Sequence, residues 1–141
     1  MRVVTAGVFD LFHYGHVKLL ERCNAISDGK GVTVLLNTDE FVTEYKKKPA
    51  FPYKHRKKIL ESSTYVVQVL KNTRYGFRKQ MQKLAPCILV VGTDWVKKDY
   101  YKQMEMTPED LEYLGIELVY VPYTEGISTS SIKKGIENGD L

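Results

Sequence analysis

Residues 3–16 read VVTAGVFDLFHYGH, an apolar run that leads into a turn containing glycine, aspartate and histidine. The first part, residues 3–9, is short and rich in β-branched side chains, as expected of a buried strand. Beyond the turn, apolar side chains recur at helical spacing through residues 17–26. We therefore predict a strand, a turn and a helix in this order.

The same alternation continues to the end of the chain. We predict further strands at 32–36, 65–70, 88–91 and 116–121, helices at 53–62, 74–84, 108–114 and 128–137, a short helical turn capped by 37–40, and a loop at 46–52. Strands that are apolar throughout, such as 88–91, are typical of parallel sheets buried on both faces. The sequence thus predicts an α/β fold, a five-stranded parallel sheet with helices on both faces, with ligands bound at the carboxyl ends of the strands.

Length and composition favour a single domain spanning residues 1–141. The chain is 43% hydrophobic and 27% charged, which excludes a disordered or collagen-like protein. No apolar run approaches the roughly 20 residues of a membrane helix, and Met1 is not followed by an export signal, so we expect a soluble, cytoplasmic protein. Cys23 and Cys87 have no partner at metal-ligand spacing, and we expect both to be buried apolar residues.

Positive charge is concentrated in the middle of the chain. Residues 46–83 contain twelve lysines and arginines and one acid, Glu61, although the formal net charge of the whole chain is only +4. Such a segment suits a polyanionic ligand, and a solvated set of helix faces is the alternative. Nucleic acid is not favoured as the ligand, because few aromatic side chains are interleaved with these charges.

The turn after the first strand holds two histidines three residues apart, His13 and His16, with Gly15 between them. Both lie where the next helix is expected to begin. Backbone N–H groups and imidazole N–H groups together form an anion site at such a position. A metal-binding pair or two structural histidines are the alternatives, but no third metal ligand is evident.

A second candidate anion site follows the last predicted strand. Residues 122–131 read PYTEGISTSS and open the final helix. Gly126 gives the backbone freedom there, and Ser128 or Thr129 can cap the helix and bond phosphate oxygens. Serine-rich helix caps are common, so this pattern gains weight only together with the histidine turn.

These motifs together resemble those of the cytidylyltransferase family. The resemblance rests on His-x-Gly-His at 13–16 after Gly-x-Phe-Asp at 7–10, and on TEGIST at 124–129. Further matches are NTDEF at 37–41, Tyr-x-His-Arg-Lys at 53–57 and Gly-x-Asp-Trp at 92–95. The match covers nearly the whole chain. Within the family, the sequence most resembles the small bacterial glycerol-3-phosphate cytidylyltransferases.

The resemblance implies a dimeric Rossmann-like enzyme that transfers CMP from CTP to a small phosphorylated acceptor and releases pyrophosphate. It also implies that Mg²⁺ accompanies the nucleotide near Asp10, without a metal-ligand set in the protein. Catalytic roles are implied for His13, His16 and Lys46; nucleotide contacts for Gly7, Val8, Phe9, Asp10, Gly15, Gly92, Asp94, Trp95, Thr124, Glu125, Gly126, Ile127, Ser128 and Thr129; and acceptor contacts for Lys46, Lys48 and Arg56.

The sequence departs from the pattern of its close relatives at three positions. Val8 replaces a threonine, and Thr64 and Tyr123 each replace an arginine. Arginine binds phosphate through two N–H groups at once, so its loss weakens anion binding or indicates a different acceptor. Arg74 or Arg78 could supply the missing charge. Glycerol 3-phosphate is the expected acceptor; another phosphomonoester or phosphonate, adenylyl transfer, or a non-catalytic nucleotide sensor are the alternatives.

Overall fold

The computed structural model describes residues 1–92, 99–122 and 128–139. Within these residues, five parallel strands form one sheet in the order β3-β2-β1-β4-β5. The strands are β1 (Arg2–Gly7), β2 (Val32–Asn37), β3 (Val66–Asn72), β4 (Cys87–Gly92) and β5 (Ile116–Val121). The predicted five-stranded parallel sheet is confirmed. Because β1 lies between β2 and β4, the chain reverses its direction of travel across the sheet there, which places a crevice at the carboxyl ends of β1 and β4.

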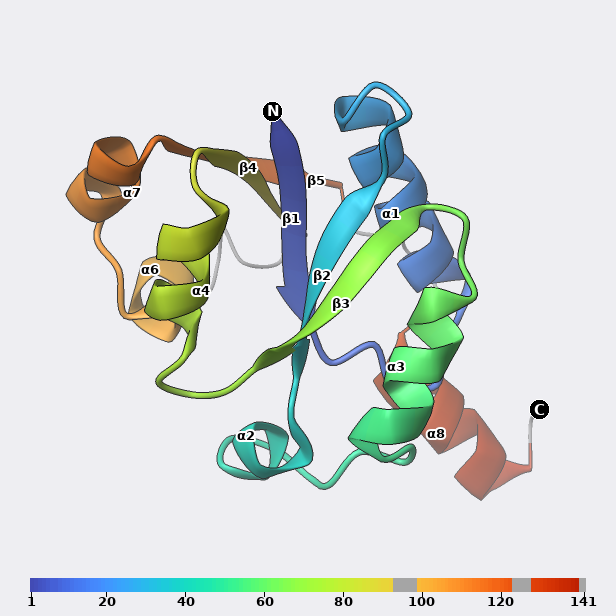
Figure 1. Ribbon diagram of the computed structural model, residues 1–141. Helices are drawn as coiled ribbons and strands as arrows, with labels where there is room; N and C mark the ends of the chain where they lie inside the picture. The colour runs from blue at the N-terminus through green and yellow to red at the C-terminus, as the bar shows by residue number, and fades with distance from the viewer. Residues whose placement is uncertain (93–98, 123–127, 140–141) are drawn as a thin grey trace.

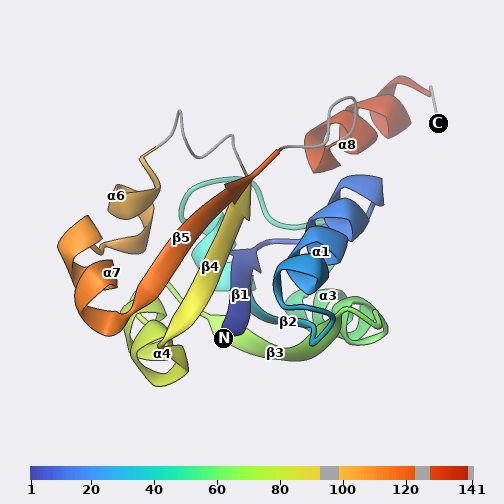
Figure 2. The same ribbon diagram turned by 90° about the horizontal axis from the view of Figure 1, so that it is seen from above.

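Helices cover both faces of the sheet, as predicted. They are α1 (Tyr14–Ile26), α2 (Asp39–Thr43), α3 (Tyr53–Glu61), α4 (Phe77–Leu84), α6 (Tyr100–Met104), α7 (Pro108–Leu114) and α8 (Thr129–Asn138). Figures 1 and 2 show α1 and α3 on one face, and α4, α6 and α7 on the other. The helix α2 lies beyond the carboxyl ends of the strands, and α8 lies at the same end, beside the start of α1.

The core consists of two layers that the alternation of strand residues creates. Val4, Leu35 and Leu89 point toward α4, α6 and α7, while their neighbours Val3, Leu36 and Val90 point toward α1 and α3. All six side chains are fully buried or nearly so. Burial of both faces explains why these strands are apolar throughout. The two cysteines are buried and free, one in each layer, which confirms their prediction as apolar core residues.

The predicted bounds differ from the observed ones where polar residues continue or interrupt an element. The strand predicted at 65–70 runs on to Asn72, because its backbone stays paired with β2 up to the pair Asn37 and Asn72. The helix predicted at 74–84 begins only at Phe77, after a turn that ends at the N-cap Gly76. The short helix α6 was not predicted. In the described part of the chain, no helix is long and apolar enough to cross a membrane.

Candidate active site

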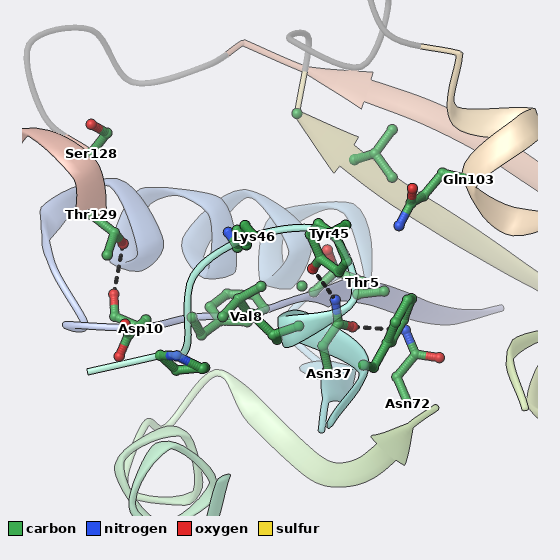
Figure 3. Close-up of a pocket in the computed structure, with 18 of the residues that line it drawn as sticks. Thr5, Val8, Asp10, Asn37, Tyr45, Lys46, Asn72, Gln103, Ser128 and Thr129 are labelled. Atoms are coloured by element: carbon green, nitrogen blue, oxygen red, sulfur yellow. Dashed lines mark hydrogen bonds between the residues drawn. The ribbon is translucent and has the colours of Figure 1, made fainter. Parts of the chain in front are cut away.

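A cleft of about 1770 Å³ opens at the carboxyl ends of the strands. Figure 3 shows part of its lining. Many of the predicted site residues line it: Gly7, Val8, Phe9, Asp10, His13, Gly15, His16, Lys46, Gly92, Ser128 and Thr129. Lys48 and Arg56 do not line it. The predicted contacts Asp94, Trp95, Thr124, Glu125, Gly126 and Ile127 lie outside the described residues.

The turn after β1 is strained and is held in place from several sides. Phe9 and Leu11 have φ angles of 51° and 48°, in the left-handed region that residues other than glycine rarely adopt. Between them, the buried Asp10 carboxylate accepts hydrogen bonds from the backbone amides of Ala50 (2.7 Å) and Phe51 (3.0 Å). This carboxylate therefore fixes the turn against the loop that precedes α3.

Asp10 also joins the turn to the last helix. The Lys133 ammonium on α8 lies 3.2 Å from a carboxylate oxygen of Asp10, and the Thr129 hydroxyl donates to the Asp10 carbonyl at 2.7 Å (Figure 3). Burial would raise the pKa of the Asp10 carboxyl, but the two amide hydrogen bonds and Lys133 outweigh it and lower the pKa. Asp10 is thus an anion that holds two ends of the chain together beside the cleft.

The two histidines form the start of α1. His13 is the N-cap: its Nδ1 accepts from the Gly15 amide at 3.0 Å, and its own amide donates to His16 Nδ1 at 3.1 Å. The two rings stack with centroids 3.8 Å apart. Because each Nδ1 is an acceptor, the proton of each neutral ring is on Nε2. Each imidazole therefore offers one N–H donor away from the helix.

The surroundings keep both rings neutral. Burial lowers the pKa of His13. Burial, followed by the neighbouring His13 and Lys46, lowers the pKa of His16 to about 3, although Asp10 acts in the opposite direction. A neutral ring of this tautomer donates to a phosphate oxygen through Nε2–H, while its Nδ1 lone pair is already engaged by a backbone amide. The pair is therefore suited to hydrogen bonding of anions and not to general-base catalysis.

The helix α8 points its first turn into the same cleft. Ser128 is the N-cap and accepts from the Ser131 amide at 3.0 Å, while Ser128, Thr129 and Ser130 all line the cleft. The amides of the first helical turn have no partner within the helix and attract anions. The structure thus brings the histidine turn and the final helix cap, more than 100 residues apart, to one site.

Arg56, for which we expect an acceptor contact, is buried among the loops that frame the cleft. The residue is 1% exposed, and its guanidinium bonds four groups of the protein. The guanidinium donates to the carbonyls of Phe51, Val8 and Asn37 at 2.8–2.9 Å, and to the Asp39 carboxylate at 2.6 Å. Its hydrogen-bonding capacity is used to fasten the loops after β1 and β2 to α3. In this structure Arg56 holds the loops that frame the cleft and is not among the residues that line it, and its contact with an acceptor stays a prediction.

Only part of the basic segment 46–83 faces the cleft. Lys46, Lys47 and Arg74 line it, whereas the other basic residues of the segment do not. Arg78 bonds Asp110 at 2.9 Å, and Arg74 lies 3.7 Å from Glu44. The solvated-face alternative thus holds for most of the segment. Lys47 was missed because the sequence of three consecutive lysines does not reveal which side of the loop each one takes.

The carboxyl ends of β2 and β3 add polar residues that the sequence reasoning did not single out as ligands. Asn37, Asn72 and Tyr45 line the cleft and are joined by hydrogen bonds (Figure 3). Lys133 and Lys134 on α8 also line it. The charge and polarity of the cleft therefore come from the ends of several strands, as in many α/β sites.

The sequence of this chain matches a known protein family. The family model named cytidylyltransferase-like matches residues 4–135. The chain is 42% identical over 135 residues to the glycerol-3-phosphate cytidylyltransferase of Bacillus spizizenii, covering 94% of this chain and 95% of the relative. It is 39% identical over 137 residues to the protein of that name from Bacillus subtilis, covering 96% of each chain.

Solved structures agree on the fold. The lipopolysaccharide core biosynthesis protein from Thermoplasma volcanium superimposes with a TM-score of 0.70 at 23% identity, covering 88% of this chain and 96% of that chain. This likeness supports the Rossmann-like architecture alone. Because the family model matches residues 4–135 and the two Bacillus relatives are 39% and 42% identical over most of the chain, this chain belongs to the cytidylyltransferase-like family.

Proposed function

We propose that this protein transfers CMP from CTP to glycerol 3-phosphate, forming a CDP-linked product and pyrophosphate. The relatives named glycerol-3-phosphate cytidylyltransferase support both the nucleotide and the acceptor. The observation that carries the proposal is the convergence of His13, His16 and the first turn of α8 on one cleft. Two helix N-termini that lie next to each other at a strand-end crevice provide a site for a triphosphate.

The proposed reaction is an in-line substitution at the α-phosphorus of CTP. A phosphate oxygen of the acceptor forms the new bond, and the bond from the α-phosphorus to the oxygen bridging to the β-phosphate breaks. Negative charge moves onto the departing pyrophosphate. Catalysis then consists of positioning and electrostatic stabilisation, with no covalent intermediate on the protein.

The roles of the residues follow from their donors. The Nε2–H groups of His13 and His16 donate to the phosphate oxygens on which charge increases. The first turn of α8, with Ser128 and Thr129, holds the β- and γ-phosphates. Lys46 supplies a cation beside His16, whose pKa it helps to lower. None of these groups has to exchange a proton with the substrate.

The acceptor phosphate requires its own cation, because Thr64 and Tyr123 provide no arginine. We assign this role to Arg74, which lines the cleft and is half-exposed; Lys47 lines the same cleft. Arg78 is bonded to Asp110 and lies outside the cleft lining. Arg74 lies 3.7 Å from Glu44 and 5.0 Å from the centre of the Tyr75 ring, and its side chain is half-exposed, so an incoming phosphate can reach its guanidinium.

We propose that Mg²⁺ enters with the triphosphate. Among the described residues, no three His, Cys, Asp or Glu side chains cluster in a way that would hold a metal ion. The carboxylate of Asp10 already accepts hydrogen bonds from three backbone amides and pairs with Lys133. This donor set fits a metal held mainly by phosphate oxygens, as is usual for Mg²⁺, with Asp10 nearby. When bound, Mg²⁺ would neutralise charge on the leaving pyrophosphate.

We further propose, from the family resemblance, that the enzyme is a homodimer and works in the cytoplasm. Analytical ultracentrifugation tests the first point: a sedimentation coefficient that corresponds to twice the mass of one chain supports it, and that of a single 16.2 kDa chain opposes it.

A pyrophosphate-release assay tests the proposed activity. The purified protein is given Mg²⁺, CTP or ATP, and in turn glycerol 3-phosphate, phosphoethanolamine, phosphocholine and a phosphonate. We expect turnover with CTP and glycerol 3-phosphate, and a loss of about a hundredfold or more in His16→Ala. Turnover with ATP and an acceptor, but not with CTP, would indicate an adenylyltransferase. Tight CTP binding without pyrophosphate release in the presence of any of the acceptors would indicate a nucleotide sensor.

A further inference from the structure

Two buried asparagines lie side by side on the floor of the cleft. Asn37 ends β2 and Asn72 ends β3, and the two are partners in the register of the sheet. They are 6% and 4% exposed. Nδ2 of Asn72 donates to Oδ1 of Asn37 at 2.8 Å, and Nδ2 of Asn37 donates to the Tyr45 hydroxyl at 2.9 Å. The chain Tyr45, Asn37, Asn72 is visible in Figure 3.

This chain leaves one polar atom without a partner. Within the described part of the protein, Oδ1 of Asn72 is buried and accepts no hydrogen bond. Burying a carboxamide oxygen unpaired reduces the stability of the folded state, and such atoms are rare in native proteins. Oδ1 lies on the side of the carboxamide turned away from Asn37 (Figure 3). A bound ligand with a donor group would satisfy it.

The position of Asn72 points to the acceptor as that ligand. The proposed triphosphate site uses the ends of β1 and β5, through α1 and α8. The ends of β2 and β3 lie on the opposite side of β1 in the sheet. Arg74, to which we assigned the acceptor phosphate, follows Asn72 by two residues and lines the same cleft. A phosphorylated alcohol bound at Arg74 therefore places its carbon chain next to Asn72.

We propose that Asn72 is a specificity-determining residue whose Oδ1 accepts a hydrogen bond from a hydroxyl group of the acceptor, and that Asn37 and Tyr45 are positioning residues that orient it. The inference rests on the proposed function and narrows its substrate class to phosphorylated polyols. Because Nδ2 of Asn72 is engaged by Asn37, the carboxamide presents oxygen and not nitrogen. It therefore selects a hydrogen-bond donor.

The expected consequence is discrimination between glycerol 3-phosphate and its analogue without hydroxyls, n-propyl phosphate. Both carry the same phosphate and the same number of carbon atoms. An acceptor that leaves the Asn72 oxygen unpaired loses roughly tenfold to a hundredfold in kcat/KM, the usual effect of one buried polar group left without its partner. Phosphocholine, whose ammonium carries no hydrogen, should be rejected in the same way.

The experiment measures kcat/KM of the full chain, with CTP and Mg²⁺, for glycerol 3-phosphate and n-propyl phosphate. Asn72→Leu removes the oxygen and keeps similar volume. We expect its ratio of the two kcat/KM values to fall to near one, while kcat/KM for n-propyl phosphate and KM for CTP stay within about twofold of wild type. Gln68→Leu is the matched control, because it removes an exposed carboxamide from the same strand outside the cleft lining, and it should keep the wild-type ratio.

A second variant guards against a failure of Asn72→Leu to fold. Tyr45→Phe removes the hydroxyl that accepts from Asn37 and leaves the half-exposed ring in place. We expect this variant to stay folded, with a slightly lower unfolding temperature, and to have a several-fold lower ratio. The inference is overturned if wild type uses both acceptors equally, or if both variants lower the two rates in proportion. Absence of any pyrophosphate from wild type with CTP and glycerol 3-phosphate is a different result, which overturns the proposed function.

Discussion

Replacing Arg56 by lysine separates a role in building the cleft from a role in binding the acceptor. The arginine is 1% exposed and serves four acceptors from three parts of the chain. A lysine ammonium sits at a single point and does not span the carbonyls of Val8, Asn37 and Phe51 together. With two of these acceptors left unpaired at about 1–3 kcal/mol each, we expect unfolding to cost about 3 kcal/mol less.

The assay is urea unfolding followed by far-UV circular dichroism, with Lys54→Ala as the control on the same helix. Lys54 is exposed, and its variant should stay within about 0.5 kcal/mol of wild type. Under conditions where Arg56→Lys is folded, KM for CTP and for the acceptor should rise together, because the loops on both sides of the cleft loosen. A variant of wild-type stability that raises only the acceptor KM would refute the reasoning and restore the direct contact predicted from sequence.

Three further predictions follow from the site. The pKa of His16 is lowered to about 3 in the folded state, against an ordinary value near 6.5, so below about pH 6.5 the unfolded chain binds a proton that the folded chain does not. The free energy of unfolding therefore falls on acidification below this pH, by up to about 1.4 kcal/mol per pH unit. Urea unfolding at several pH values should show a weaker pH dependence in His16→Gln. An equal pH dependence in wild type and variant would contradict the lowered pKa. Arg74→Ala should raise the acceptor KM about tenfold or more with a smaller effect on CTP, while Arg78→Ala should leave both unchanged; equal effects of the two variants would oppose the assignment. Removal of Mg²⁺ by EDTA should abolish pyrophosphate release without shifting the thermal unfolding of the nucleotide-free protein, whereas a lower unfolding temperature would indicate a metal held by the protein itself.

Hydrophobic patterning predicted the sheet because burial on both faces leaves a strong signal. Strands such as β4 are apolar along their length, and apolar strands separated by helices favour parallel packing. The histidine turn was also predictable, since its residues are close in sequence and their spacing places both at a helix start. The structure confirms that this turn and Thr129 share one cleft.

Features set by distant contacts were not predictable in the same way. The family resemblance placed Arg56 at the acceptor. Its burial could not be predicted from the neighbouring residues, because its partners, the Val8 and Asn37 carbonyls, lie elsewhere in the chain. The pairing of Asn37 with Asn72 depends on the register of β2 and β3, which a single sequence does not specify. The five-residue helix α6 is too short for a periodic pattern.

The shared triphosphate site is best examined in a crystal structure of the protein with a non-hydrolysable CTP analogue and Mg²⁺. We predict one triphosphate between the two helix starts, with Nε2 of His13 and His16 and the first-turn amides of α8 within hydrogen-bond distance of its oxygens. A nucleotide whose phosphates contact only one of these helix starts, or that lies at the ends of β2 and β3, would contradict the proposed mechanism.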